Sequence, residues 1–279
     1  MKRHFIILLV LAVALTGFLF SRPKVVVKDE AKANRDKPVA AQNSTAKSED
    51  NHDEDSHTMQ LSAELQKKVD DFKEQLANAK DKAQKGKLLT EIAEVFAQGG
   101  RIDSAAKYIE QIAIAEPTPT NWKKAGDTYF QAFNLALRQE NMSSLAEKTR
   151  FCYQKVLDTN PRDLSAKTNV AMTYVGSETP MQAIMTLREV LEEDPNYVPA
   201  LMNLGVLSMQ SNQYDKAMER FRSVLRIDPN NINAEFGLGY SLIELDRKED
   251  ARKVFQDLKN KVKEPTLVEE VNKTLESLK

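Results

Sequence analysis

Three short segments of similar composition recur at equal distances, and this spacing constrains the fold more than any other feature of the chain. DTNPRD, EEDPNY and RIDPNN contain Pro161, Pro195 and Pro229, which lie 34 residues apart. A fixed period of this length indicates an array of equivalent structural units, each of which buries its apolar face against the next. The three breaks are therefore predicted to separate units rather than domains.

Apolar and small residues keep a fixed register within these units. We number positions 1–34 in the units 86–119, 164–197, 198–231 and 232–265, so that the proline falls at position 32, or two residues later in the last unit. Small residues at positions 8 and 20 let two antiparallel helices approach closely, and the proline with its neighbouring Asp or Asn ends the second helix. The residues at position 8 are Ala93, Ala171, Gly205 and Gly239, those at position 20 are Ala105, Ala183, Ala217 and Ala251, and those at position 24 are Ile109, Leu187, Phe221 and Phe255.

The stretch LMNLGVLSMQSNQYDKAMERFRSVLRIDPNN, within the unit 198–231, resembles the tetratricopeptide repeat family over a whole unit. The resemblance covers about residues 86–265 and includes three consecutive units in register. It implies an all-α fold, a right-handed superhelical α-solenoid of antiparallel helix pairs. It also implies that the first helix of each unit lines a concave groove that binds a protein or peptide.

The unit 120–163 departs from the pattern. Trp122, Ala125 and Gly126 fit positions 4, 7 and 8, but Pro161 follows 39 residues after Trp122, where the repeat predicts 28. The additional residues amount to about three helical turns, so we predict an elongated helical hairpin with QENMSS at its tip. Two interpretations remain open, a tolerated insertion and an added docking surface. Cys152 lies in the second helix of this hairpin and is interpreted as buried packing.

Segments at both ends of the array carry a single apolar face. The segments 59–85 and 266–279 place large apolar residues at three- and four-residue steps, which fits helices that cap the first and last units. The helix predicted over Leu61–Ala83 is an alternative candidate for a coiled coil with a second copy, and the cap is preferred. The apolar residues of the two faces are Leu61, Leu65, Val69, Phe72 and Leu76, and Leu267, Val271, Leu275 and Leu278.

The amino terminus has a different character. A basic leader, residues 1–4, precedes the uncharged run FIILLVLAVALTGFLF, Phe5–Phe20. As a helix this run spans about 24 Å, slightly less than a hydrocarbon core of about 30 Å. The following FLFSRPK offers no small-x-small cleavage site, so an uncleaved transmembrane signal-anchor is preferred to a cleaved signal peptide.

Residues 21–58 show no apolar periodicity, and their charged and small polar composition predicts a disordered linker. The leader layout favours export of the carboxy-terminal body, although basic residues after the apolar run favour the opposite orientation. We predict a single-pass protein of a bacterial inner membrane with the repeats on the periplasmic side. The cluster of His52, Asp53, Asp55 and His57 is interpreted as solvated charge, because the linker provides no fixed frame for a metal.

The composition gives little support to catalysis or nucleic-acid binding. A net charge of −1, from 40 basic and 41 acidic residues, creates no general attraction to nucleic acid. All three histidines precede residue 58, and no phosphate-binding G-x-x-x-x-G-K-[ST] motif occurs. Gly239 in GLGYSL is explained by position 8 of the repeat. We therefore expect no enzymatic activity, no cofactor and no metal site.

The resemblance assigns a candidate binding face. Positions 2, 5, 6, 9, 12 and 13 of the first helix face the groove in that family. Asn169 and Asn203 both occupy position 6, where an amide can hydrogen-bond an extended backbone, and methionines suit an apolar partner of variable shape. The candidate residues are Lys123, Asn169, Met172, Met202, Asn203, Val206, Met209, Phe236, Tyr240 and Ile243.

Two of these residues have an alternative role, and one type of ligand is not expected. Val206 and Ile243 fit inter-repeat core equally well. Some members of the family clamp a terminal carboxylate with cations, but Asn233 and Gly237 stand at the corresponding positions of the last unit. Lys123 with the two asparagines is at most a fragment of such a clamp, so an apolar or helical segment is the favoured ligand.

These observations predict a membrane-tethered scaffold or adaptor for a partner protein or peptide, in envelope protein assembly, secretion or maturation. One alternative is a self-associating structural element of a larger membrane complex, with the Leu61–Ala83 helix or the long hairpin as the contact. Another is an accessory role in cytochrome c maturation, which membrane-anchored repeat proteins of similar layout perform. The sequence contains no haem-handling motif in support of that alternative.

Overall fold

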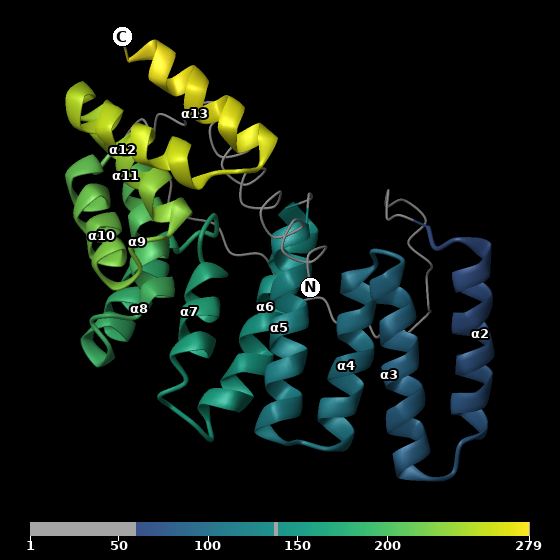
Figure 1. The fold of residues 1–279 in the computed structure, drawn as a ribbon. Coiled ribbons are helices and arrows are strands. Elements are labelled where there is room, and N and C mark those ends of the chain that lie inside the picture. The colour runs from purple at the N-terminus through teal and green to yellow at the C-terminus, as the bar shows by residue number, and fades with distance from the viewer. Residues whose placement is uncertain (1–59, 137–138, 279) are drawn as a thin grey trace, which may run out of the picture. The chain divides into compact units, whose positions relative to one another are not determined.

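The computed structural model describes residues 60–136 and 139–278, which form helices α2–α13 (Figure 1). These residues contain no strand, so the prediction of an all-α fold is confirmed. The predicted membrane segment Phe5–Phe20 and the linker 21–58 lie outside the described residues. Within the described part of the chain, no helix is both long and apolar enough to cross a membrane.

Each helix packs against the next one along the chain (Figure 1). The helices pair as the first and second helix of successive units, with α2 before the first pair and α13 after the last. Their bounds are α2 Ala63–Asn78, α3 Lys82–Gln98, α4 Ile102–Ala115, α5 Pro119–Leu135, α6 Gln139–Leu157, α7 Leu164–Met172, α8 Pro180–Glu193, α9 Val198–Gln210, α10 Tyr214–Ile227, α11 Ile232–Glu244, α12 Lys248–Lys261 and α13 Pro265–Ser277.

The recurring proline ends the second helix as predicted. Helices α8 and α10 each stop two residues before their proline, and the residue between has left the helical conformation, with φ −139° at Asp194 and −129° at Asp228. The same aspartates stabilise the turn, because their Oδ1 atoms accept hydrogen bonds from the amides of Asn196 (2.9 Å) and Asn230 (3.2 Å). One residue later, Asn231 caps α11 by accepting from the amide of Ala234 (3.0 Å).

The small residues of the repeat receive aromatic rings. A Cβ added to Gly205 or to Gly237 would lie 2.7 Å or 2.5 Å from the ring of Phe221, which is 1% exposed. Gly239 lies against the ring of Phe255 in the same way, at 2.6 Å. The glycines at position 8 are therefore required because the ring at position 24 lies directly on the first helix.

The elongated unit consists of two long helices. Helices α5 and α6 have 17 and 19 residues, compared with 13 and 14 in α9 and α10. The prediction that QENMSS forms the tip is wrong, because these residues form the first turns of α6. Helix α5 ends at Leu135 and α6 begins at Gln139, so most of the additional length extends the helices.

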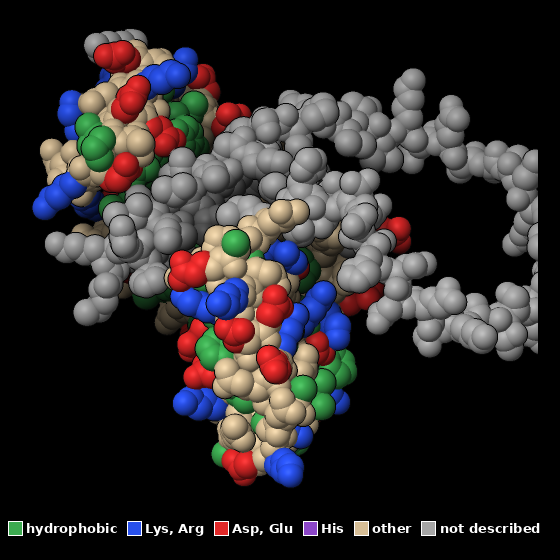
Figure 2. Space-filling model, turned by 90° about the vertical axis from the view of Figure 1, so that its right-hand side faces the viewer, with side chains coloured by type: hydrophobic (Ala, Val, Ile, Leu, Met, Phe, Trp, Pro, Cys, Tyr) green, Lys and Arg blue, Asp and Glu red, His purple; other side chains and the backbone are tan. Residues whose placement is uncertain are grey.

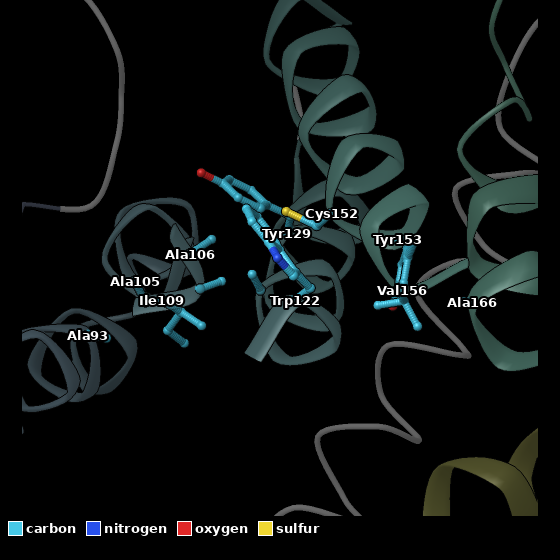
Figure 3. Close-up of a cluster of buried hydrophobic side chains, with 12 residues drawn as sticks. Ala93, Ala105, Ala106, Ile109, Trp122, Tyr129, Cys152, Tyr153, Val156 and Ala166 are labelled. Atoms are coloured by element: carbon cyan, nitrogen blue, oxygen red, sulfur yellow. The ribbon is translucent and has the colours of Figure 1, made fainter. Parts of the chain in front are cut away.

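The buried centre of this unit joins helices α3 to α7 (Figure 3). Its largest side chains include Trp122 and Tyr129 of α5 and Tyr153 of α6, each at most 8% exposed. The Tyr129 hydroxyl donates to Glu110 Oε2 (2.5 Å), and Lys148 Nζ donates to both Glu110 oxygens (2.9 and 3.1 Å). The buried carboxylate of Glu110 is thus compensated by two donors.

The first helix of the third unit is unusually short. Helix α7 ends at Met172, after nine residues, and a series of turns with Gly176 at φ 81° leads to α8. Helix α6 holds this early end: the Arg150 guanidinium lies over the Tyr174 ring (4.9 Å) and donates to Thr173 Oγ1 (3.1 Å). Thr173 and Tyr174, which would continue α7, are therefore held by contacts with α6 although the helix has already ended.

Both ends of the array are covered by helices with one apolar face. Helix α2 packs Leu65, Val69, Phe72 and Leu76 into a cluster with α3, which Leu61 joins from just before the helix, and α13 buries Leu267 and Val271. Figure 2 looks onto the α2 end, where acidic and basic side chains alternate over the surface. Residues 57–279 form one compact unit, and the core clusters named above lie entirely within it.

Candidate functional site

The ten predicted binding residues lie on α5, α7, α9 and α11, the first helices of successive units. Every one of them is half-buried. Helix α9 contacts both α7 and α11, so residues from three of these helices lie on neighbouring elements. Their local chemistry nevertheless divides them into two groups, one polar and one apolar.

The polar group centres on Tyr153 of α6. Asn169 Nδ2 donates to the Tyr153 hydroxyl (2.7 Å), which itself donates to Asp127 Oδ1 (2.5 Å). Burial, and next the neighbouring Asp127 carboxylate, raise the pKa of Tyr153 above its ordinary value. The amide hydrogen of Asn169 that was predicted to bind a ligand is therefore engaged within the protein.

Lys123 belongs to the same group. Its Nζ donates to Ser165 Oγ (3.2 Å), lies 3.6 Å from Asp163 Oδ1, and sits 5.7 Å from the centroid of the Tyr153 ring. Asp163 in turn caps α7 by accepting from the amide of Ala166 (2.8 Å). Lys123 thus links α5 to the start of α7, and its charge is balanced by an internal carboxylate.

The apolar group occupies α9 and α11. We call it the apolar face, and we include Asn203, which lies among these residues in sequence. Asn203 makes no hydrogen bond to any described residue, in contrast to Asn169 at the same repeat position. The members of the apolar face are Met202, Asn203, Val206 and Met209 of α9 and Phe236, Tyr240 and Ile243 of α11. Met172 is the last residue of α7 and packs against the core cluster that includes α9.

The aromatic end of the apolar face is held rigidly. Phe236 and Tyr240 stack with centroids 6.3 Å apart, and both rest edge-on against Phe255, at 6.0 and 5.4 Å. The Tyr240 hydroxyl donates to Glu270 Oε1 of α13 (2.7 Å). Burial, with the hydrogen bond to Glu270, raises the pKa of Tyr240 to about 12. This phenol is neutral at physiological pH and presents an uncharged surface.

Sequence reasoning missed several residues of these groups. Asp127 occupies position 9 of its unit, so the repeat register could have identified it. Glu270 lies beyond the last complete unit, and Tyr153 lies in the elongated hairpin, where the additional residues obscure the register. No pattern in the sequence connected Tyr153 with Asn169.

A cleft of 340 Å³ lies elsewhere, between α2, α3 and α4, and contains none of the predicted residues. Leu76, Leu89 and Ile112 form its apolar lining, and Lys82 and Lys85 are also in its wall. Position 1 of the unit is Gly86 here, whereas the later units have Leu164, Val198 and Ile232. The missing side chain at Gly86, where an added Cβ would meet nothing within 4 Å, leaves this space open.

The groups described so far suit binding rather than bond-breaking chemistry. Burial, and next the charge of Glu110, raise the pKa of Cys152 to about 12, so this thiol is not poised as a nucleophile. Among the described residues, no group of three or more His, Cys, Asp or Glu side chains is placed to hold a metal ion.

Comparison with known proteins finds a family match over the later repeats. The model described as Tetratricopeptide repeat matches residues 174–225 and 208–268. None of the curated proteins compared with the chain matches it significantly.

Two solved structures are similar in fold. One is a tetratricopeptide repeat protein from Parabacteroides merdae, with a TM-score of 0.53, 15% identity, and coverage of 72% of this chain and 74% of that chain. The other is TTC0263, a thermophilic TPR protein of Thermus thermophilus, with a TM-score of 0.50, 16% identity, and coverage of 68% and 98%. The family match thus covers residues 174–268, and the described residues have an all-helical fold similar to that of tetratricopeptide repeat proteins.

Proposed function

We propose that this chain is a membrane-tethered scaffold that holds a partner protein through an apolar segment bound to the apolar face. The observation that carries the proposal is the free amide of Asn203 among half-buried apolar side chains. Such a surface offers burial to apolar side chains and a hydrogen-bonding group to a backbone. The uncharged lining favours an apolar segment over a charged terminus.

The tether and the cellular role are also proposals. The uncharged run Phe5–Phe20 has the composition of a signal-anchor, and a linker of 38 residues after it has a root-mean-square reach of about 35 Å if flexible. A scaffold placed in this way would act near the bilayer, in envelope protein assembly, secretion or maturation. Carbonate extraction of membranes from cells expressing the full chain tests the tether, which predicts retention that deletion of residues 5–20 abolishes.

The partner proposal is tested by affinity capture with the full chain and a matched pair of variants. Asn203→Asp introduces a charge into the apolar face, whereas Asn260→Asp makes the same change at an exposed position of α12. We expect a partner captured by the wild type and by Asn260→Asp to be lost with Asn203→Asp. Equal capture by all three proteins would contradict the proposed face.

Self-association through α2 receives no support from its packing. The apolar residues of α2 already contact α3, so a coiled coil with a second copy would have to expose Ile92 and Val95. The structure of α2 therefore favours a monomeric cap at this end.

A further inference from the structure

Helix α8 presents two methionines to solvent. Met181 and Met185 are 61% and 50% exposed, and they lie one helical turn apart on the side opposite the buried Ala183 and Leu187. Isolated exposed apolar residues are ordinary, but two successive ones form an apolar strip on a helix that is otherwise amphipathic.

The repeat register shows that this strip is specific to α8. Met181 and Met185 occupy positions 18 and 22, where the other regular units carry charged pairs. Phe151 of α6 is the closest counterpart, but it already contacts Trp122 edge-on (5.7 Å) and lies under Lys155 (5.4 Å). The charged pairs at these positions are Asp103 and Lys107, Asp215 and Glu219, and Glu249 and Lys253.

Charged residues of opposite sign flank the strip symmetrically. Glu178, in the bend just before α8, lies three residues before Met181, and Arg188 of α8 lies three residues after Met185, so their positions in the sequence are symmetric about Ala183. Both charged side chains are exposed, and neither forms an ion pair with another described residue. Arg188 also lies near Arg220, whose pKa is lowered first by burial and next by this like charge. A carboxylate partner for Arg188 would relieve that repulsion.

We propose that α8 pairs with α8 of a second copy of this chain, antiparallel about a two-fold axis at the level of Ala183. In this arrangement Met181 of each copy lies opposite Met185 of the other, and Glu178 lies opposite Arg188. A two-fold interface requires a surface that is complementary to itself, and this segment satisfies that requirement in both its apolar and its charged residues.

The size of the contact sets its strength. Two methionines and two charged residues from each copy cover far less than the roughly 800 Å² per partner of a standard interface. The dimer is therefore weak in solution, with a dissociation constant on the order of 100 μM. Met181, Met185 and Arg188 belong to α8 and Glu178 to the bend before it, so the pairing and the apolar face share no residue.

The test is sedimentation of residues 57–279, the compact unit, between about 10 μM and about 1 mM, which brackets the weak affinity expected for so small a contact. Each ion pair occurs twice in the dimer, so Arg188→Glu or Glu178→Arg alone creates two like-charge contacts and weakens dimerisation about tenfold or more. The double variant with both charges exchanged restores the pairs and should regain the wild-type affinity. Met185→Glu abolishes the dimer, whereas Met185→Leu retains it.

Arg222→Glu is the matched control, because Arg222 occupies the same repeat position on α10 as Arg188 on α8. It should leave the dissociation constant unchanged. A mass that stays monomeric up to about 1 mM, which exceeds the affinity range of even small interfaces, overturns the proposal. Failure of the exchanged double variant to recover dimerisation, with folding intact by circular dichroism, also overturns it.

Discussion

At the scale of single residues, two asparagines at the same repeat position have different environments. Asn169 is bonded to the buried Tyr153 hydroxyl, and Asn203 has no hydrogen-bond partner among the described residues. Asn169→Asp removes the donor and places a second carboxylate near Asp127, so we expect a loss of about 1–3 kcal/mol of unfolding free energy. Asn203→Asp should change it by no more than about 0.5 kcal/mol. Urea denaturation of residues 57–279 measures both, and equal losses would contradict the assignment.

Gly237 gives a second residue-scale prediction. An added Cβ would lie 2.5 Å from the Phe221 ring, which is buried between two helices and cannot move freely. Gly237→Ala should therefore destabilise the protein by about 1–3 kcal/mol through overpacking. Gly86→Ala is the control, since it lies inside α3 with open space around it. That change should stabilise the protein by up to about 1 kcal/mol, because alanine favours the helix. A thermal melt of each variant provides the comparison.

The repeat register predicted which positions carry small residues and which carry large ones. It did not predict the contacts that require these sizes. Glycine at positions 6 and 8 is identifiable from the sequence, whereas its contact with a ring on the neighbouring helix depends on three-dimensional packing. For this reason Gly237 was interpreted only as a missing cation of a ligand clamp, while the structure gives it a packing role. Similarly, Asn169 and Asn203 are equivalent in the repeat, and only the position of Tyr153 separates them.

At the scale of secondary-structure elements, α7 depends on its N-cap residue more than the longer helices do. It has nine residues, and Asp163 both caps it and approaches Lys123. Asp163→Ala should cost about 1–2 kcal/mol, the effect of losing an N-cap. Asp163→Asn keeps the cap and loses only a half-exposed ion pair, so its cost should stay within about 1 kcal/mol. Guanidinium denaturation distinguishes these outcomes, and similar losses for both variants would assign the effect to the charge.

The lengths of the elements were only partly predictable. The additional residues between Trp122 and Pro161 indicated a longer hairpin, but they did not specify where the chain turns, because QENMSS is compatible with a helix start as well as with a loop. The early end of α7 is marked in sequence by Gly176 and Pro180. The regular period outweighed these signals, since it predicts a first helix as long as α9.

At the scale of the whole molecule, buried phenols make stability sensitive to alkaline pH. The pKa of Tyr240 is raised to about 12, and those of Tyr129 and Tyr153 are also raised, in each case mainly by burial. A tyrosine in the unfolded chain ionises near pH 10. The stability that Tyr240 gives the folded protein through its raised pKa is thus complete below pH 10 and is lost as the pH rises towards 12.

We therefore expect the urea midpoint to fall between pH 9 and pH 11. The Tyr240→Phe variant should show a smaller fall, because one of the three phenols no longer titrates. An identical fall in wild type and variant would mean that Tyr240 ionises freely in the folded protein. Absorbance of tyrosinate at the same pH values provides an independent measurement.

The helices α2 and α13, which cover the two ends of the array, have a consequence for assembly. A repeat array that ends in an uncovered apolar face can add a further copy at that end and grow without limit. Here a helix covers each end of the described array, so the number of stacked units is set by the sequence and does not depend on protein concentration. Association through α8, as proposed above, takes place along the flank of the array and stops at two copies.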